Sequence, residues 1–183
     1  MNAFESLVSL NLIPQIGSVR LEALLKHFEK PENIFKATRQ DLVAASTEQI
    51  GQGIASFDFR RLENDLAAAK KQGVNIITFF DQDYPPSLKE IPGAPIVLYV
   101  LGKIILEDNL SFGIVGSRRA SLYGLINAEK FASGLSSQGV TIVSGMARGV
   151  DTYAHRGALK VQGRTIAVMG SGFNHIYPAE NAG

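Results

Sequence analysis

The sequence predicts an α/β protein in which a small all-helical domain precedes an extended Rossmann-like domain with a doubly wound, mostly parallel sheet. Three observations support this fold class. Apolar residues recur at helical spacing through the first 71 residues, two β-branched and aromatic runs follow, and strands then alternate with helices from residue 112 onward. Strands that are apolar on both faces are typical of parallel sheets, because helices cover those faces.

The first segment, residues 1–72, is expected to form a domain of short helices. Apolar side chains repeat at helical spacing in Leu21–Phe28 and Leu62–Ala69, and proline or glycine interrupts the pattern elsewhere. The run Ile13–Arg20 resembles a helix-hairpin-helix turn, whose backbone N–H groups can bind DNA phosphates. More often such a glycine only joins two helices, so both interpretations stay open.

Two strands are expected in the segment that follows. Residues 74–80 and 96–101 are rich in β-branched and aromatic side chains, and the prolines between them cannot continue a helix. We expect both strands to be appended to the edge of the main sheet. The second domain is therefore predicted to cover residues 73–183.

From residue 112 the pattern becomes strand, helix, strand, helix, strand. The predicted strands cover residues 112–115, 140–143 and 165–169, and the predicted helices cover residues 122–138 and 150–161. Gly139 follows the first of these helices, as glycine commonly does at a helix C-terminus. A doubly wound sheet normally continues with another helix after its third strand, so we expect the domain to extend beyond Gly183.

Composition excludes several classes of site. The 183 residues contain no cysteine, which rules out disulfides, thiolate zinc sites and a cysteine nucleophile, and fits a reducing cytoplasm. Apolar runs fall short of the roughly 18 residues that cross a bilayer, and the first residues lack the basic start of a signal peptide. We therefore expect a cytoplasmic protein with no membrane partner. The formal net charge of +1 says little about partners, since a basic patch can be hidden in a neutral total.

The three predicted parallel strands are each followed by a loop suited to binding an anion. These loops are Gly116–Ser121, Ser144–Gly149 and Gly170–His175, and the first two contain arginine. Ligands of parallel sheets bind at the carboxyl ends of the strands, where glycine allows close backbone approach and helix N-termini present N–H groups. Glycine and serine are ordinary residues in any one such loop. Three converging loops, two of them with arginine, favour a phosphate-binding site.

Signatures of nucleotide enzymes are missing from these loops. The first loop begins G-S-R-R-A-S instead of G-x-G-x-x-G, and the chain has no Gly-Lys-Ser/Thr triplet for ATP hydrolysis. Asp151 and His155 are four residues apart without a nucleophile nearby, which favours a carboxylate at a helix start and a locally bonded histidine. Three scattered histidines do not suggest a metal site. We therefore expect a binding protein with no catalytic residue, cofactor or metal, and not an enzyme.

Several motifs occur in order along the second half of the chain. They are Gly116–Arg119, Tyr123-Gly124, Ser144–Asp151 with Ala154-His155, Gly157–Leu159, Thr165–Val168 and Tyr177–Asn181. In this order and spacing they resemble the DNA-processing protein A (DprA, also called Smf) family, densely from residue 112 to residue 181. The segment of residues 73–101 matches the family more loosely, and the helical start matches it in outline.

The resemblance implies a Rossmann-like domain behind a sterile-alpha-motif-like helical domain, in a cytoplasmic homodimer. It also implies binding of the single-stranded DNA that enters bacteria during natural transformation, protection of that DNA, and help in loading the RecA recombinase. Carried over by position, the implied DNA-binding residues are Arg118, Ser144, Gly145, Arg148, Arg164 and His175. The composition of the first loop adds Gly116, Ser117, Arg119 and Ser121 to the predicted DNA-binding residues. Some members have an aromatic base-stacking residue where this chain has His175.

The physical hypothesis is that N–H groups after Ser117 and Gly145, with the guanidinium groups of Arg118, Arg148 and Arg164, gather at one edge of the sheet and bind phosphates. Such binding does not depend on the DNA sequence and depends strongly on salt concentration.

One alternative function is that of a nucleotide-hydrolysing enzyme related to lysine-decarboxylase-like phosphoribohydrolases, although their PGGxGT loop and its glutamate are missing here. A second alternative is a module that binds a small nucleotide without catalysis.

Overall fold

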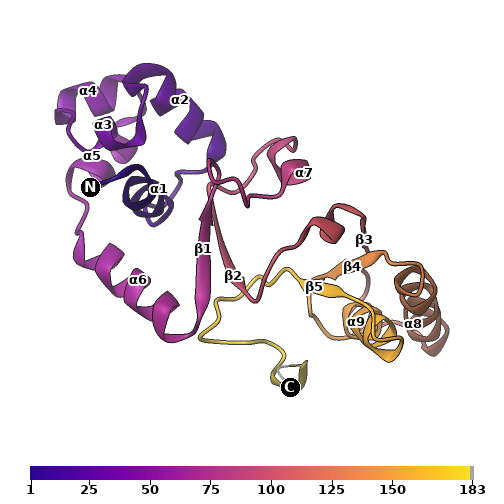
Figure 1. The fold of residues 1–183 in the computed structure, drawn as a ribbon. Helices are drawn as coiled ribbons and strands as arrows, with labels where there is room; N and C mark the ends of the chain where they lie inside the picture. The colour runs from indigo at the N-terminus through magenta and orange to yellow at the C-terminus, as the bar shows by residue number, and fades with distance from the viewer. Residues whose placement is uncertain (182–183) are drawn as a thin grey trace. The chain divides into compact units, whose positions relative to one another are not determined.

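The computed structural model describes residues 1–181, which fold into two compact units (Figure 1). The first unit covers Met1–Ile104, and the second begins at Ile105. Ala182 and Gly183, after which we expected the domain to continue, lie outside the described residues. Within residues 1–181, none of the helices is both long and apolar enough to cross a membrane.

Residues 1–72 form six helices in the first unit. They are α1 (Ala3–Asn11), α2 (Ser18–Phe28), α3 (Pro31–Ile34), α4 (Arg39–Ala44), α5 (Glu48–Ala55) and α6 (Arg60–Lys71). Local capping explains several starts: Asn2 and Glu5 form a reciprocal capping box, and the hydroxyls of Thr38 and Thr47 accept N–H groups of α4 and α5. The predicted short helices are present, whereas their likeness to a sterile alpha motif stays a prediction.

The segment after α6 forms a β-hairpin that belongs to the first unit. β1 (Val74–Thr78) and β2 (Val97–Leu101) pair antiparallel in a two-stranded sheet of their own. The Tyr99 hydroxyl of β2 donates to the Asp65 carboxylate of α6 at 2.6 Å, and apolar side chains of both strands pack on the helices. The expectation that these strands extend the main sheet is therefore wrong, because they pair with each other. The compact units accordingly divide after residue 104, whereas we predicted a domain boundary after residue 72.

The connection between β1 and β2 contains a one-turn helix, α7 (Pro86–Lys89). Its first residue is a proline, which is common at this position because the backbone N–H of the first helical residue has no partner within the helix.

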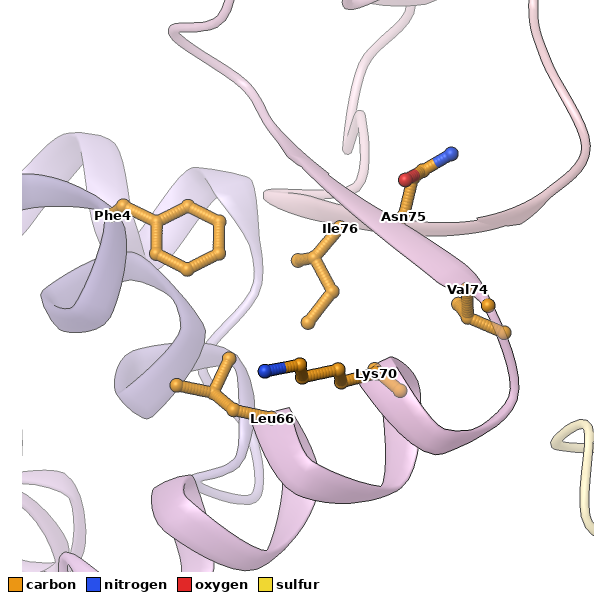
Figure 2. A pocket seen from close by; sticks show the side chains of 8 residues that line it. Phe4, Leu66, Lys70, Val74, Asn75 and Ile76 are labelled. Atoms are coloured by element: carbon orange, nitrogen blue, oxygen red, sulfur yellow. The ribbon is translucent and has the colours of Figure 1, made fainter.

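The first unit also has a cleft of about 370 Å³ between α1, α6 and β1. Figure 2 shows Phe4, Leu66 and Ile76 around this cleft, with the Lys70 side chain lying along it. The cleft is lined by none of the residues predicted to bind DNA.

The second unit is built around a parallel sheet. Its described residues form β3 (Ser111–Gly113), β4 (Thr141–Ser144) and β5 (Thr165–Ala167), which pair in that order. α8 (Leu122–Ser136) connects β3 to β4, and α9 (Val150–Lys160) connects β4 to β5. Two short 3₁₀ helices, η1 (Leu106–Asn109) and η2 (Ala179–Asn181), flank this core in the sequence. The predicted alternation of strands and helices is confirmed; β3 and β5 are shorter than predicted, and β4 has the predicted length but lies one residue further along the chain.

Small residues allow α8 and α9 to pack closely on the same face of this sheet. Ala132 of α8, together with Ala154 and Ala158 of α9, is fully buried in one cluster with Ile142 of β4. Gly157 is needed where the helices cross, because a Cβ there would collide with a carbonyl oxygen of α8. Since the strands are parallel, all three end at one edge of the sheet, the carboxyl edge, and begin at the opposite one, the amino edge.

Candidate nucleic-acid interface

The first loop at the carboxyl edge joins β3 to α8 and carries two arginines. Ser121 caps α8 with its hydroxyl, which accepts the Gly124 N–H at 3.3 Å, and the Ser117 hydroxyl accepts the Arg119 N–H at 3.1 Å. These bonds fix the backbone on both sides of the arginines. Arg118 and Arg119 are exposed, and within residues 1–181 neither guanidinium group has a hydrogen-bond or ion-pair partner. The predicted cationic loop is therefore accessible to a ligand.

The second loop, between β4 and α9, is folded by contacts of its own. One carboxylate oxygen of Asp151 accepts the N–H groups of Gly145 at 3.2 Å and Ala147 at 3.3 Å. Ser144 is 3% exposed, and its hydroxyl donates to the Ile114 carbonyl oxygen at 2.6 Å. Both groups are bonded within the fold, so a phosphate would have to replace these bonds, and the contact of Ser144 and Gly145 with phosphate stays a prediction.

The first two loops lie against each other. The Val150 N–H donates to the Ser117 carbonyl oxygen at 3.3 Å, and a Cβ at Gly149 would collide with the same oxygen. Gly149 also has a φ of 81°, which side-chain-bearing residues rarely adopt. A Cβ at Gly116 would lie 2.8 Å from the Cγ2 atom of Val150. These two glycines therefore allow the loop of Arg118 to contact the loop of Arg148.

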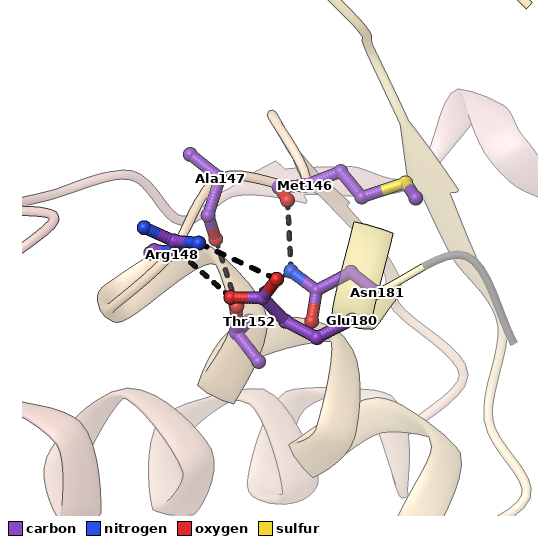
Figure 3. A network of polar contacts seen from close by, with 6 residues as sticks. All are labelled: Met146, Ala147, Arg148, Thr152, Glu180 and Asn181. Carbon is purple, nitrogen blue, oxygen red and sulfur yellow. Dashed lines mark hydrogen bonds and ion pairs between the residues drawn. The ribbon is translucent and has the colours of Figure 1, made fainter. Parts of the chain in front are cut away.

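Arg148 is exposed, yet its guanidinium group has partners (Figure 3). Its Nε donates to Oε1 of Glu180 at 2.7 Å, and the group lies 5.6 Å from the centroid of the Tyr177 ring. The hydrogen bond between the two side chains raises the pKa of Arg148 and lowers the pKa of Glu180. A phosphate would have to replace Glu180 in order to make the predicted contact with Arg148.

The segment that carries Glu180 is itself attached to the second loop. The Asn181 amide donates to the Met146 carbonyl oxygen at 2.9 Å and to the Thr152 hydroxyl at 2.7 Å (Figure 3). That hydroxyl in turn donates to the Ala147 carbonyl oxygen at 2.8 Å. Reasoning from single residues missed these contacts. The available signal was that Tyr177–Asn181 is one of the motifs of the family resemblance.

The third loop, Gly170–His175, follows β5 at the same edge. The Val168 N–H donates to the Ser144 carbonyl oxygen at 2.8 Å, which continues the pairing of β5 with β4 up to this loop. His175 is exposed, and its backbone N–H donates to the Gly172 carbonyl oxygen at 3.0 Å. A role of this imidazole in DNA binding stays a prediction.

Arg164 lies at the amino edge of the sheet. It directly precedes β5, and its guanidinium group donates to both carboxylate oxygens of Asp108, at 2.5 and 2.7 Å. The Asp108 side chain is 6% exposed and also accepts the Thr141 hydroxyl at 3.0 Å. The hydrogen bond from Arg164 holds the pKa of Asp108 below its usual range. The expectation that Arg164 gathers with Arg118 and Arg148 at one edge is therefore wrong, because the length of the strands separates it from the carboxyl edge. Its part in DNA binding stays a prediction.

Asp151 and His155 do not form an acid–base pair. Asp151 accepts loop N–H groups, whereas Nδ1 of His155 lies 2.7 Å from the Thr165 hydroxyl, which donates to the Ile142 carbonyl oxygen. Burial lowers the pKa of His155. Both side chains are therefore bonded within the fold, and the absence of a catalytic role for them stays a prediction. Among residues 1–181, no group of side chains has the composition of a metal site.

The parallel sheet, its crossover helices and the adjoining loops at the carboxyl edge define a Rossmann-like α/β protein with a candidate anion site. The family model described as DNA recombination-mediator protein A matches residues 75–183. The chain therefore belongs to the DNA recombination-mediator protein A family, which confirms the resemblance noted from its motifs.

Individual relatives agree with this assignment. Protein Smf of Synechocystis sp. is 36% identical over 175 residues, which cover 91% of this chain and 44% of the relative. DNA processing protein DprA of Bacillus subtilis is 39% identical over 124 residues, which cover 67% of this chain and 42% of the relative. The X-ray structure of DprA from Streptococcus pneumoniae matches with a TM-score of 0.76 at 28% identity, over 99% of this chain and 62% of that one. The chain thus spans less than half the length of the two curated relatives.

Proposed function

We propose that the carboxyl edge of the parallel sheet binds the phosphate backbone of single-stranded DNA, with Arg118 and Arg119 as its principal contacts. The observation that carries the proposal is the pair of exposed guanidinium groups on a loop whose backbone is fixed by serine hydroxyls. Arginine can bind phosphate through two parallel charge-assisted hydrogen bonds, which are stronger than neutral ones. Arg148 in the adjoining loop adds a third cation once phosphate replaces Glu180.

Membership of the family supports the wider role that we propose. Its description names recombination mediation, and relatives are named for DNA processing. On this basis the protein protects single-stranded DNA during natural transformation and helps to load the RecA recombinase, as a cytoplasmic homodimer. Its activity is binding without catalysis, which agrees with the engagement of Asp151 and His155 in bonds within the fold.

Fluorescence anisotropy with labelled oligo-dT across a salt series tests the DNA contact. Since each phosphate contact to a single strand contributes about −0.7 to the slope of log K against log salt, Arg118→Ala should lower affinity about tenfold and reduce that slope by about 0.7. Arg156→Ala removes the same charge from an exposed position on α9 and should leave the slope nearly unchanged. Salt-independent binding, or equal effects of the two variants, would contradict the proposal.

The enzyme alternative has a direct test of its own. Incubation with AMP and chromatography of the products should show no release of adenine. Thermal-shift measurements should show stabilisation by short single-stranded oligonucleotides and none by mononucleotides. Adenine release would favour the nucleotide-hydrolysing alternative, and stabilisation by mononucleotides alone would favour a small-nucleotide module.

A further inference from the structure

An aromatic side chain with no assigned role stands beside the arginine loop. Tyr123 is the second residue of α8 and is 79% exposed. Within residues 1–181 its ring contacts no other aromatic ring, and its hydroxyl has no hydrogen-bond partner. Single exposed aromatic residues are ordinary on protein surfaces, so exposure alone decides nothing. A role of Tyr123 is indicated by its surroundings.

Tyr123 is held on a rigid turn that adjoins Arg118 and Arg119. The Ser121 hydroxyl caps the helix by accepting the Gly124 N–H, and the Tyr123 carbonyl oxygen accepts the Asn127 amide at 2.8 Å. Side chains of an α-helix lean toward its N-terminus, so a residue in the first turn covers the turn that precedes it. By this rule, a side chain at the position of Tyr123 leans toward the loop that carries Arg118 and Arg119.

A flat ring beside exposed cations matches the two chemical features of an unpaired nucleic-acid strand. Proteins that bind single strands combine positive charge, which follows the phosphates, with aromatic rings on which bases stack. In a duplex the base faces are already stacked on one another and cannot reach such a ring. We propose that Tyr123 is a base-stacking residue of this interface and favours single-stranded over double-stranded DNA; this rests on the proposed function of the arginine loop.

Two oligonucleotides of equal length and charge separate stacking from phosphate binding. Anisotropy is measured for a single-stranded oligo-dT and for an abasic strand, which has phosphates but no bases. Tyr123→Ala and Tyr123→Leu should weaken oligo-dT binding roughly 5- to 150-fold, whereas Tyr123→Phe, which keeps the ring, should bind as the parent does. All three variants should bind the abasic strand unchanged.

The matched variant Arg118→Ala distinguishes the failure of this inference from the failure of the proposed function. Arg118→Ala should weaken binding of both oligonucleotides. If it does and Tyr123→Ala leaves oligo-dT binding intact, the stacking role is overturned and the phosphate site remains. Equal losses for both oligonucleotides in Tyr123→Ala, or full binding by Tyr123→Leu, would also overturn the stacking role. If neither Arg118→Ala nor Tyr123→Ala has an effect, both assignments fail.

Discussion

Arg164 and Arg118 lie at opposite edges of the same parallel sheet, and their surroundings differ. Arg164 precedes β5 at the amino edge, where the nearly buried Asp108 carboxylate accepts two of its N–H bonds. Arg118 follows β3 at the carboxyl edge, where residues 1–181 provide it with no acidic partner. An arginine neutralised inside the fold stabilises the fold, whereas an exposed and unpaired one is available to phosphate. The role of an arginine therefore depends on which end of a strand it adjoins and on whether an acidic side chain lies there.

The largest expected effect concerns the contact that builds the carboxyl edge from two loops. Gly149→Ala should lower the free energy of unfolding by about 3 kcal/mol or more, because the added methyl group would collide with the Ser117 backbone at a strained φ. Urea denaturation measures this loss. Gly134→Ala in α8, where the added Cβ would have no atom within 4 Å, is the control and should add about 0.5–1 kcal/mol. Equal stabilities of the two variants would show that the loops are not joined in this way.

The amino edge should respond to loss of its arginine in stability and not in DNA binding. Arg164→Ala leaves the Asp108 carboxylate without its cation and should lower the free energy of unfolding by about 2 kcal/mol, less than for a fully buried pair because the Arg164 side chain is 36% exposed. Arg118→Ala should change stability by less than about 0.5 kcal/mol while weakening DNA binding. Urea denaturation and anisotropy on both variants measure the contrast. If Arg164→Ala is as stable as the parent but binds DNA more weakly, the structural role of Arg164 at the amino edge is contradicted.

A pH dependence should come from His155, which contacts the start of β5. Because burial lowers its pKa from the ordinary value of 6.5, the unfolded chain takes up a proton first as the pH falls through 6.5. Stability should therefore be complete above about pH 7.5 and fall toward pH 5.5, by at most about 1.4 kcal/mol per pH unit. Urea denaturation at several pH values measures the slope. His155→Gln keeps an N–H donor for Thr165 and should make the free energy of unfolding less dependent on pH. If the pH dependence of His155→Gln equals that of the parent, another group causes it.

The smallest expected effect concerns the ion pair of Arg148 at the carboxyl edge. Glu180→Gln should strengthen oligo-dT binding by about two- to fivefold, because an exposed ion pair is weak and its loss leaves Arg148 available to phosphate. Glu129→Gln removes the carboxylate that pairs with Lys160 at 2.8 Å and controls for the loss of one negative charge. Anisotropy at fixed salt compares the two variants. If both bind equally well, Glu180 does not compete with DNA for Arg148.

Much of the second unit could be predicted because strand and helix patterns are local. The alternation of apolar strands with helical stretches predicts β3 to β5 in order, and parallel strands place the loops of Arg118 and Arg148 at one edge. The sheet to which the β-hairpin of the first unit belongs could not be predicted, because strand pairing depends on contacts between distant parts of the chain. Its strands have an ordinary β pattern, and only packing on the helical core distinguishes a separate hairpin from an edge strand.

The sequence by itself determined which segments become strands and helices and which loops carry arginine, because periodicity and glycine positions act over a few residues. Tertiary structure decided which arginine stays available. The bond of Arg164 to Asp108 spans 56 residues, and the bond of Arg148 to Glu180 spans 32 residues. Charge partners that far apart meet only after the chain has folded, so the availability of each cation is a property of the packed structure.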